Sequence, residues 1–343
     1  MHKIAAIALW STLSLQTAQA ASSSAAKLAL CVYDPLSQAG DIYRYAKDYV
    51  LQMPRFGIMN PFELKAYNNE TLLVNAFRSG QCDAALMTTL RTREFNKYTA
   101  SLEAIGGTTS KEDINLALQV LASKQLAPKM SQGDYEVIGL IPLGTVYLMV
   151  DNRNINSVEK AAGKKIAVLD YDSSEALMVK KFGGKAVSTD LLTIGSKFIN
   201  HQVNIMVGPA VMVKPFELAK GMTTTDGFVQ GAIVRVPVLQ FTATMLVHKT
   251  KFSSPDANQK IREYVYSQLG TAYKYIDNAE KTIDPKLWMD VAPKDKQAFI
   301  NLIRDTRIEL TKNGTYDKDM MHLLKNVRCK TDPSRSECSI KDE

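Results

Sequence analysis

The feature that most constrains the fold is a repeated alternation of apolar, β-branched segments with amphipathic helical segments. Residues 28–33 form the first predicted strand, and apolar side chains recurring every three or four residues from Ile42 to Met53 predict a helix after it. Strands at 62–67 and 82–87 flank a helix that Asn69 caps and Gly80 ends. This order and spacing predict parallel strands joined by helical crossovers, and therefore an α/β fold.

The alternation is interrupted and begins again between residues 144 and 174. An extended run at 144–151 ends in an asparagine-rich turn, Ser157 caps a short helix, and a strand at 165–170 opens a second series. Helices at 175–182 and 191–200 and strands near 186–188 and 203–207 continue that series, and a helix to about residue 218 follows. We interpret the interruption as the passage from one α/β lobe to a second.

The remainder of the chain is predicted to return to the first lobe and then to become helical. Two strands at 231–236 and 239–248 precede a long helix at 255–278, and further helices end near residues 313 and 327. We therefore predict a two-lobed α/β fold with mixed, mainly parallel sheets and a helical C-terminal region. The first lobe comprises 27–147 and 240–275, the second 148–239, and residues 276–343 form helices and a disulfide-bonded tail packed on both.

The first residues of the chain have the pattern of an export signal. His2 and Lys3 precede an apolar run, and the small residues of Ala18-Gln19-Ala20 fit a cleavage site, so residues 1–20 are predicted to be a signal peptide. Residues 21–26 are expected to be a disordered linker. The apolar run is too short to span a bilayer, which disfavours the alternative of a membrane anchor. An exported chain of this kind is expected in the periplasm.

Four cysteines in an exported chain indicate disulfide bonds. Cys329 and Cys338 are close in sequence and are expected to close a short C-terminal loop. Cys31 and Cys82 fall in two neighbouring predicted strands, where they are either bridged or two buried thiols. Neither pair has the spacing of zinc ligands, and no metal or cofactor is expected.

A search for catalytic motifs is negative. Ser157-x-x-Lys160 matches the short pattern of serine acylases, but Ser157 is explained as a helix cap and the companion motifs are missing. The glycine-rich run at 106–111 lacks the spacing of a phosphate-binding loop. The net charge of +7 is scattered along the chain, which disfavours nucleic-acid binding. The pattern favours a binding protein over an enzyme, and a hydrolase is disfavoured.

Loops at the carboxyl ends of the predicted strands carry the candidate ligand-binding residues, because open parallel sheets bind ligands there. Side chains on the strands that cross between the lobes join them. The candidates are Asp34, Gln38, Thr88, Thr89, Arg91, Tyr147, Asp170, Tyr171, Asp172, Asn204, Gly208 and Phe241.

Three of these candidates have a plain structural alternative. Tyr147 would serve equally well as core packing. Asp172, or Ser173, would serve as the cap of a helix that begins at Ser174, and Arg91 would be a surface residue of a short helix.

Two segments carry a family resemblance: NINSVEKAAGKKIAV at 154–168 and FINHQVNIMVGP at 198–209. The first resembles a passage of the solute receptors of tripartite ATP-independent periplasmic (TRAP) transporters, and the second lies where that family has another characteristic segment. The long helix after the return strands resembles the family's hinge helix. The chain is also similar to a divergent receptor-like group labelled as efflux-associated proteins of aminoglycoside resistance.

The chain departs from the TRAP receptor pattern at three positions. The family's arginine that clamps a ligand carboxylate is Ala167 here, the family's aspartate in the second segment is Asn204, and the glycine after it is Ile205. The resemblance therefore implies a periplasmic-binding-protein-like fold whose ligand is not an obvious carboxylate.

The resemblance implies a periplasmic receptor that captures a small molecule by closure of a cleft and passes it to membrane transporter subunits. The alternative is a periplasmic accessory protein of an efflux or envelope-stress system that binds a protein partner. Acidic residues after the strand at 165–170 suggest a test of a cationic ligand through Asp170 and Asp172.

Overall fold

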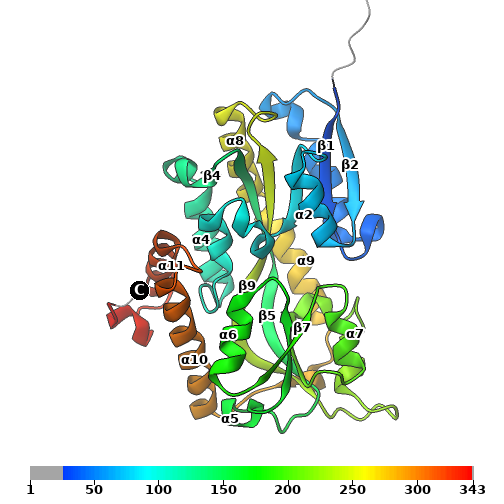
Figure 1. Cartoon of the computed structure of the whole chain (residues 1–343), viewed down its shortest axis with the longest axis vertical. Helices are drawn as coiled ribbons and strands as arrows, with labels where there is room; N and C mark the ends of the chain where they lie inside the picture. The colour runs from blue at the N-terminus through cyan, green and yellow to red at the C-terminus, as the bar shows by residue number, and fades with distance from the viewer. Residues whose placement is uncertain (1–25, 342–343) are drawn as a thin grey trace, which may run out of the picture.

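The computed structural model describes residues 26–341, so the predicted signal peptide and nearly all of the predicted linker lie outside the described residues. The first series of elements forms the upper half of Figure 1, and its strands pair in parallel. Its elements are β1 (Leu28–Tyr33), α1 (Asp41–Val50), β2 (Phe62–Tyr67), α2 (Glu70–Arg78), β3 (Ala84–Thr88), α3 (Lys97–Ala100), α4 (Lys111–Ala122) and β4 (Ser131–Gln132).

The second series forms the lower half of the molecule, again around parallel pairs. Its elements are α5 (Val158–Ala161), β6 (Lys165–Leu169), α6 (Ser173–Lys181), β7 (Lys185–Thr189), α7 (Ile194–Ile199) and β8 (Ile205–Pro209). We call the two halves the upper and lower lobes. The predicted two-lobed α/β fold is thus confirmed in its element order.

Two long antiparallel strands run through both lobes: β5 (Tyr135–Val150) and β9 (Ala232–His248). They join the lobes into one hydrogen-bonded sheet with the order β2-β1-β3-β9-β5-β8-β6-β7. Their pairing shifts register between Pro142 and Gly144 and again around Tyr147, and Gly144 has a φ of 119° that favours glycine. The two lobes therefore meet where the shared strands are most irregular.

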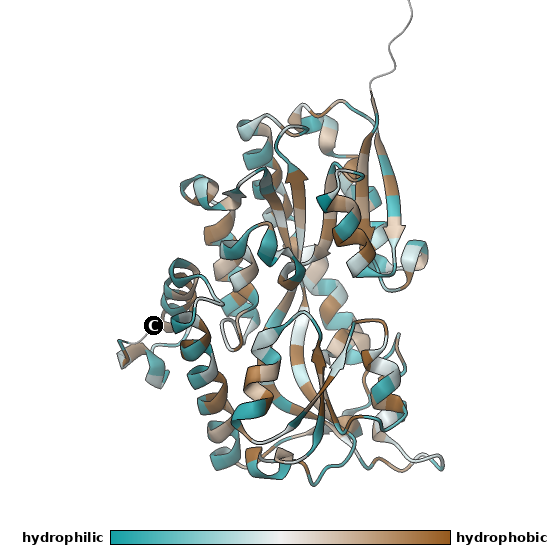
Figure 2. Cartoon of the chain, in the orientation of Figure 1, coloured by the Kyte–Doolittle hydropathy of each residue, from teal (hydrophilic) through white to brown (hydrophobic). Residues whose placement is uncertain are grey.

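Apolar side chains cover both faces of each half of the sheet, and Figure 2 shows the strands as largely apolar. In the upper lobe one face packs against α2, α4 and α11 (Lys318–Thr331), and the other against α1 and α8 (Pro255–Ser267). In the lower lobe one face packs around α7, and the other against α5, α6 and α10 (Pro293–Lys312). Each lobe thus has its own core.

Several predicted element boundaries were wrong. Segments 135–143 and 144–151 are one strand, and so are 231–236 and 239–248, because Gly144 and Pro237 sit at register shifts instead of ending the strands. The helix predicted at 255–278 breaks at Gln268 into α8 and α9 (Leu269–Lys281), next to Gly270. The helix predicted after Pro209 is only a 3-10 turn, and Glu217 there has a positive φ.

The C-terminal brace, which comprises α10, α11 and residues 332–341, lies along one flank of both lobes (Figure 1). Helix α10 packs on the lower-lobe helix α6, and α11 packs on the upper-lobe helix α4. The short strand β10 (Trp288–Met289), which precedes α10, pairs with β9. Among residues 26–341, none of the helices is both long and apolar enough to span a lipid bilayer.

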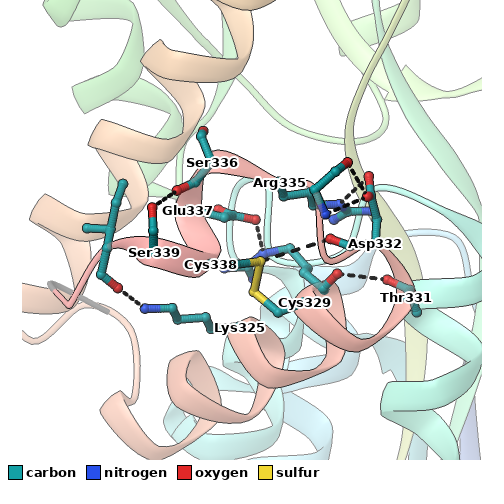
Figure 3. Close-up of a disulfide and its surroundings, with 12 residues drawn as sticks. Lys325, Cys329, Thr331, Asp332, Arg335, Ser336, Glu337, Cys338 and Ser339 are labelled. Atoms are coloured by element: carbon teal, nitrogen blue, oxygen red, sulfur yellow. Dashed lines mark hydrogen bonds and ion pairs between the residues drawn. A yellow bond between two sulfur atoms is a disulfide. The ribbon is translucent and has the colours of Figure 1, made fainter.

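Both cysteine pairs form disulfides. The expected bond between Cys329 and Cys338 closes the tail, as Figure 3 shows. Cys31 and Cys82, for which the sequence left two possibilities, are bridged in the core of the upper lobe.

Candidate functional site

A 3-10 turn at the end of β3 carries the arginines of the candidate site. The turn spans Thr89–Glu94, and the buried Glu103 carboxylate holds it by accepting hydrogen bonds from the Leu90 amide at 3.0 Å and from the Thr242 amide at 2.6 Å. The Thr242 hydroxyl donates to both Glu103 and Thr89. Burial raises the pKa of Glu103 to about 8. The turn is therefore anchored from behind by a buried polar network.

Arg91 extends from this turn to the lower lobe. Its guanidinium lies 3.8 Å from the ring centroid of Tyr171, which follows β6. On its upper-lobe side, Nη2 donates to the Thr71 hydroxyl, and Nε lies 3.9 Å from Glu70 Oε2. A cation stacked on an aromatic ring is attracted to it. This contact therefore joins the two lobes directly.

Glu70 and Tyr33 place further polar atoms beside Arg91. Glu70 is 5% exposed, and its Oε1 accepts a hydrogen bond from the Thr88 amide at 2.7 Å. Its Oε2 and the hydroxyl of the equally buried Tyr33 have no hydrogen-bond partner among the described residues. Burial raises the pKa of Glu70 to about 7, and burial followed by the Glu70 charge raises the pKa of Tyr33.

A second contact between the lobes pairs Arg93 with Asp172. Arg93 Nη1 lies 3.6 Å from Asp172 Oδ1, and that carboxylate also caps α6 by accepting from the Ser174 amide. Nε and Nη2 of Arg93 have no hydrogen-bond partner in the part of the chain that the structure describes. Nearby, Glu175 accepts from the Leu169 amide, and burial raises its pKa to about 8.

We call the residues at this junction the inter-lobe site. They share a position at the carboxyl ends of strands or in the loops and helix starts beside them, and they come from both lobes. They are Tyr33, Glu70, Arg91, Arg93, Tyr171 and Asp172. Buried polar atoms without partners are rare in folded proteins and call for an explanation such as a ligand or water. The arrangement offers hydrogen bonds and charge but no assembled nucleophile and base.

The structure brings part of the predicted set into this site. Arg91 and Tyr171 are in contact, and Asp172 serves both as a helix cap and as the partner of Arg93. Thr88 contributes its amide to Glu70, and Thr89 lies in the network behind the turn.

Other predicted residues lie elsewhere or have structural partners. Asp34 is buried and accepts from the Leu36 and Tyr43 amides, which fixes the loop after β1. Tyr147 contacts Trp288 edge-on, with 5.1 Å between ring centroids. Asn204 bonds Lys165 and Asp151 at the amino ends of β6 and β8, away from Tyr171. The remaining four are the exposed Gln38 and Asp170, and the strand residues Gly208 and Phe241.

Sequence reasoning missed three members of the site. Tyr33 is the last residue of a correctly predicted strand, and Glu70 directly follows the predicted cap Asn69. Arg93 lies two residues after the candidate Arg91, on the same polar loop. Position at a strand end was therefore the available signal, and for Glu70 the first turn of the following helix. Within residues 26–341, no group of three or more His, Cys, Asp or Glu side chains is placed to hold a metal ion.

Comparison with known structures shows the fold. A TRAP periplasmic solute-binding protein from Desulfovibrio salexigens with bound orotic acid matches with a TM-score of 0.72 at 12% identity, over 89% of this chain and 99% of that one. A TRAP periplasmic solute-binding protein from Shewanella oneidensis with bound succinate matches with a TM-score of 0.69 at 11% identity, over 88% and 99%. The resemblance seen in the sequence thus extends to the whole architecture.

Comparison with sequences shows the family. The probable solute-binding protein AdeT1 of Acinetobacter baumannii is 41% identical over 312 residues, which cover 91% of this chain and 100% of that protein. The probable solute-binding protein AdeT2 of the same organism is 24% identical over 240 residues, 70% of this chain and 98% of that protein. The family described as solute-binding protein AdeT 1/2 matches residues 2–60 and 57–343. The chain therefore belongs to the AdeT 1/2 family of solute-binding proteins.

Proposed function

We propose that this solute-binding protein is a periplasmic receptor that closes its two lobes on a small molecule at the inter-lobe site and delivers it to membrane transporter subunits. The observation that carries the proposal is the pair of contacts between the lobes, Arg91 on Tyr171 and Arg93 with Asp172. Both contacts would separate if the lobes opened, and both arginines retain N–H groups without partners. A ligand held there would complete the junction.

The irregular centre of the sheet supports a hinge. Domain closure around ligands commonly turns on a few residues that absorb changes in backbone angles. Gly144, with its positive φ, and the register shifts beside it lie in the two strands shared by both lobes. Helix α9 also lies across the level at which the lobes meet (Figure 1).

The ligand class is open to a more specific argument. The solved relatives named above carry orotic acid and succinate, both of which are carboxylic acids. This chain has Ala167 on β6, where the sequence resemblance places the family's arginine, but its upper lobe supplies Arg91 and Arg93 instead. We propose that these two arginines contact hydrogen-bond acceptors of the ligand. The receptor then works by binding alone, without catalysis.

Native mass spectrometry of protein purified from the periplasm, followed by thermal-shift and small-angle scattering titrations, tests the proposal. A retained small molecule should raise the melting temperature and reduce the radius of gyration when it is added back to dialysed protein. The accessory-protein alternative predicts a bound membrane protein with no such molecule and no compaction. That second outcome would overturn the receptor proposal.

A further inference from the structure

Three polar atoms of the inter-lobe site converge without hydrogen-bond partners among the described residues: Glu70 Oε2, Arg91 Nε and the Tyr33 hydroxyl. Glu70 and Tyr33 are both more than nine-tenths buried. Arg91 Nε lies 3.9 Å from Glu70 Oε2, too far for a direct hydrogen bond. A buried acceptor and a buried donor at this separation leave room for one bridging group between them.

The mixture of charges and hydrogen-bond roles restricts what that group can be. A carboxylate would meet the Glu70 carboxylate at close range, and an ammonium would meet the Arg91 guanidinium, so each would be repelled by one side of the pair. An apolar group would leave all three atoms unpaired, at a cost for each. A hydroxyl donates one hydrogen bond and accepts two, which matches an acceptor, an N–H donor and a phenol.

We infer that the inter-lobe site binds a hydroxyl group of its ligand between Glu70, Arg91 and Tyr33, so that the ligand is a hydroxylated small molecule such as a sugar, polyol or hydroxy acid. This inference rests on the proposed receptor function and adds the ligand class to it. Arg91 is held in place for this task by the Tyr171 ring and by the Thr71 hydroxyl. The Thr88 amide likewise fixes the other oxygen of Glu70.

The test is a thermal-shift screen, followed by calorimetry, with a metabolite library in which hydroxylated compounds are matched to deoxy partners. The pairs include D-glucose with 2-deoxy-D-glucose, malate with succinate, and serine with alanine. Measurements at pH 8.5 keep Glu70 ionised, because this pH is above its pKa of about 7. The compounds that bind should be hydroxylated, and loss of the critical hydroxyl should weaken binding at least about tenfold.

Two variants assign the hydroxyl to the three atoms. Glu70→Gln keeps an oxygen for the Thr88 amide but replaces the acceptor with a donor, and should weaken the best hydroxylated compound about tenfold or more. Tyr33→Phe should weaken it about fivefold. Tyr49→Phe is the matched control, because it removes an equally buried phenol from the cluster between α1 and α8. Circular dichroism melts establish that each variant folds.

The outcomes separate the inference from the receptor function. Binding that is equal for hydroxylated and deoxy partners, or unchanged in Glu70→Gln, would overturn the hydroxyl assignment and leave the receptor intact. No binding by any compound in the library, together with no retained molecule in native mass spectrometry, would overturn both. Selective binding that is lost in Glu70→Gln and kept in Tyr49→Phe would support both.

Discussion

Two pairs of arginines, one at the inter-lobe site and one in the C-terminal brace, show how hydrogen bonding separates binding from support. In the brace, Arg307 and Arg328 are 2% and 1% exposed, and both pair with the Glu337 carboxylate. Their remaining contacts include backbone carbonyls of the loop at 105–107. At the inter-lobe site, Arg91 and Arg93 are also shielded, but N–H groups of both lack partners.

The difference is physical and not only descriptive. A buried guanidinium that bonds a carboxylate and carbonyls ties distant segments together, and its removal should cost folding stability. A shielded guanidinium with unused donors contributes less to the fold and is available to a ligand. The brace should therefore report on stability and the inter-lobe site on binding.

The largest expected effect is on the brace, in Glu337→Ala. This change removes the carboxylate shared by two buried arginines, and the free energy of unfolding should fall by about 4 kcal/mol, as measured by urea titration. Glu309→Ala, which removes an exposed partner of Lys181, should cost less than about 1 kcal/mol. Equal losses in the two variants would contradict the assignment of the brace as a structural element.

The next effect concerns pH and Glu70. Burial raises the pKa of this carboxyl from 4.5 to about 7, so the folded protein binds its proton more tightly than the unfolded chain. The stability that this proton provides is complete below pH 4.5 and is lost as the pH rises to about 7, with a total near 3 kcal/mol. Glu70→Gln should remove that part of the pH dependence in thermal melts between pH 5 and 8.5. An unchanged pH profile would show that Glu70 ionises normally.

The Cys329–Cys338 disulfide should contribute somewhat less. It closes a loop with a sequence separation of 9 and holds Glu337 beside its arginines, as Figure 3 shows for Arg328. The double variant Cys329→Ser/Cys338→Ser should lose about 2.5 kcal/mol of stability by the loop-entropy argument. Its affinity for the ligand should remain that of the wild type, since the tail is not part of the inter-lobe site. A large loss of affinity would instead link the brace to closure.

The smallest effect on stability is expected from the ring under Arg91. Tyr171→Ala should cost about 1 kcal/mol or less of stability from the lost stacking, whereas Tyr171→Phe should keep the stack. Scattering from the ligand-free protein should show a more open average for the alanine variant than for the phenylalanine variant. Identical radii of gyration would show that this contact does not help to hold the lobes together.

The parts of the fold that could be predicted are those set by local signals. The bounds of β1 and β2 agree with the predicted strands. The predicted caps Asn69, Ser110 and Ser157 each accept the expected hydrogen bond from the first turn of their helices. Alternating periodicity and capping act over a few residues, and a single sequence carries them directly.

The parts that could not be predicted depend on contacts between distant segments. Gly144 and Pro237 have the local signal of a turn, yet pairing between β5 and β9 carries both strands past them. A glutamate such as Glu70 would ordinarily be placed on the surface, and only the Thr88 amide and the packing of the lobes explain its burial. The pairing of Arg93 with Asp172 likewise requires two lobes to be in place.

The measurement that tests the central claim most directly is the distance between the lobes with and without bound solute. Spin labels on Leu72→Cys of the upper lobe and Leu192→Cys of the lower lobe occupy exposed positions, and the four native cysteines are held in disulfides. Electron–electron resonance should show a distance distribution that becomes shorter and narrower when the solute found by native mass spectrometry is added. An identical distribution at saturating solute would contradict a receptor that works by closure of its lobes.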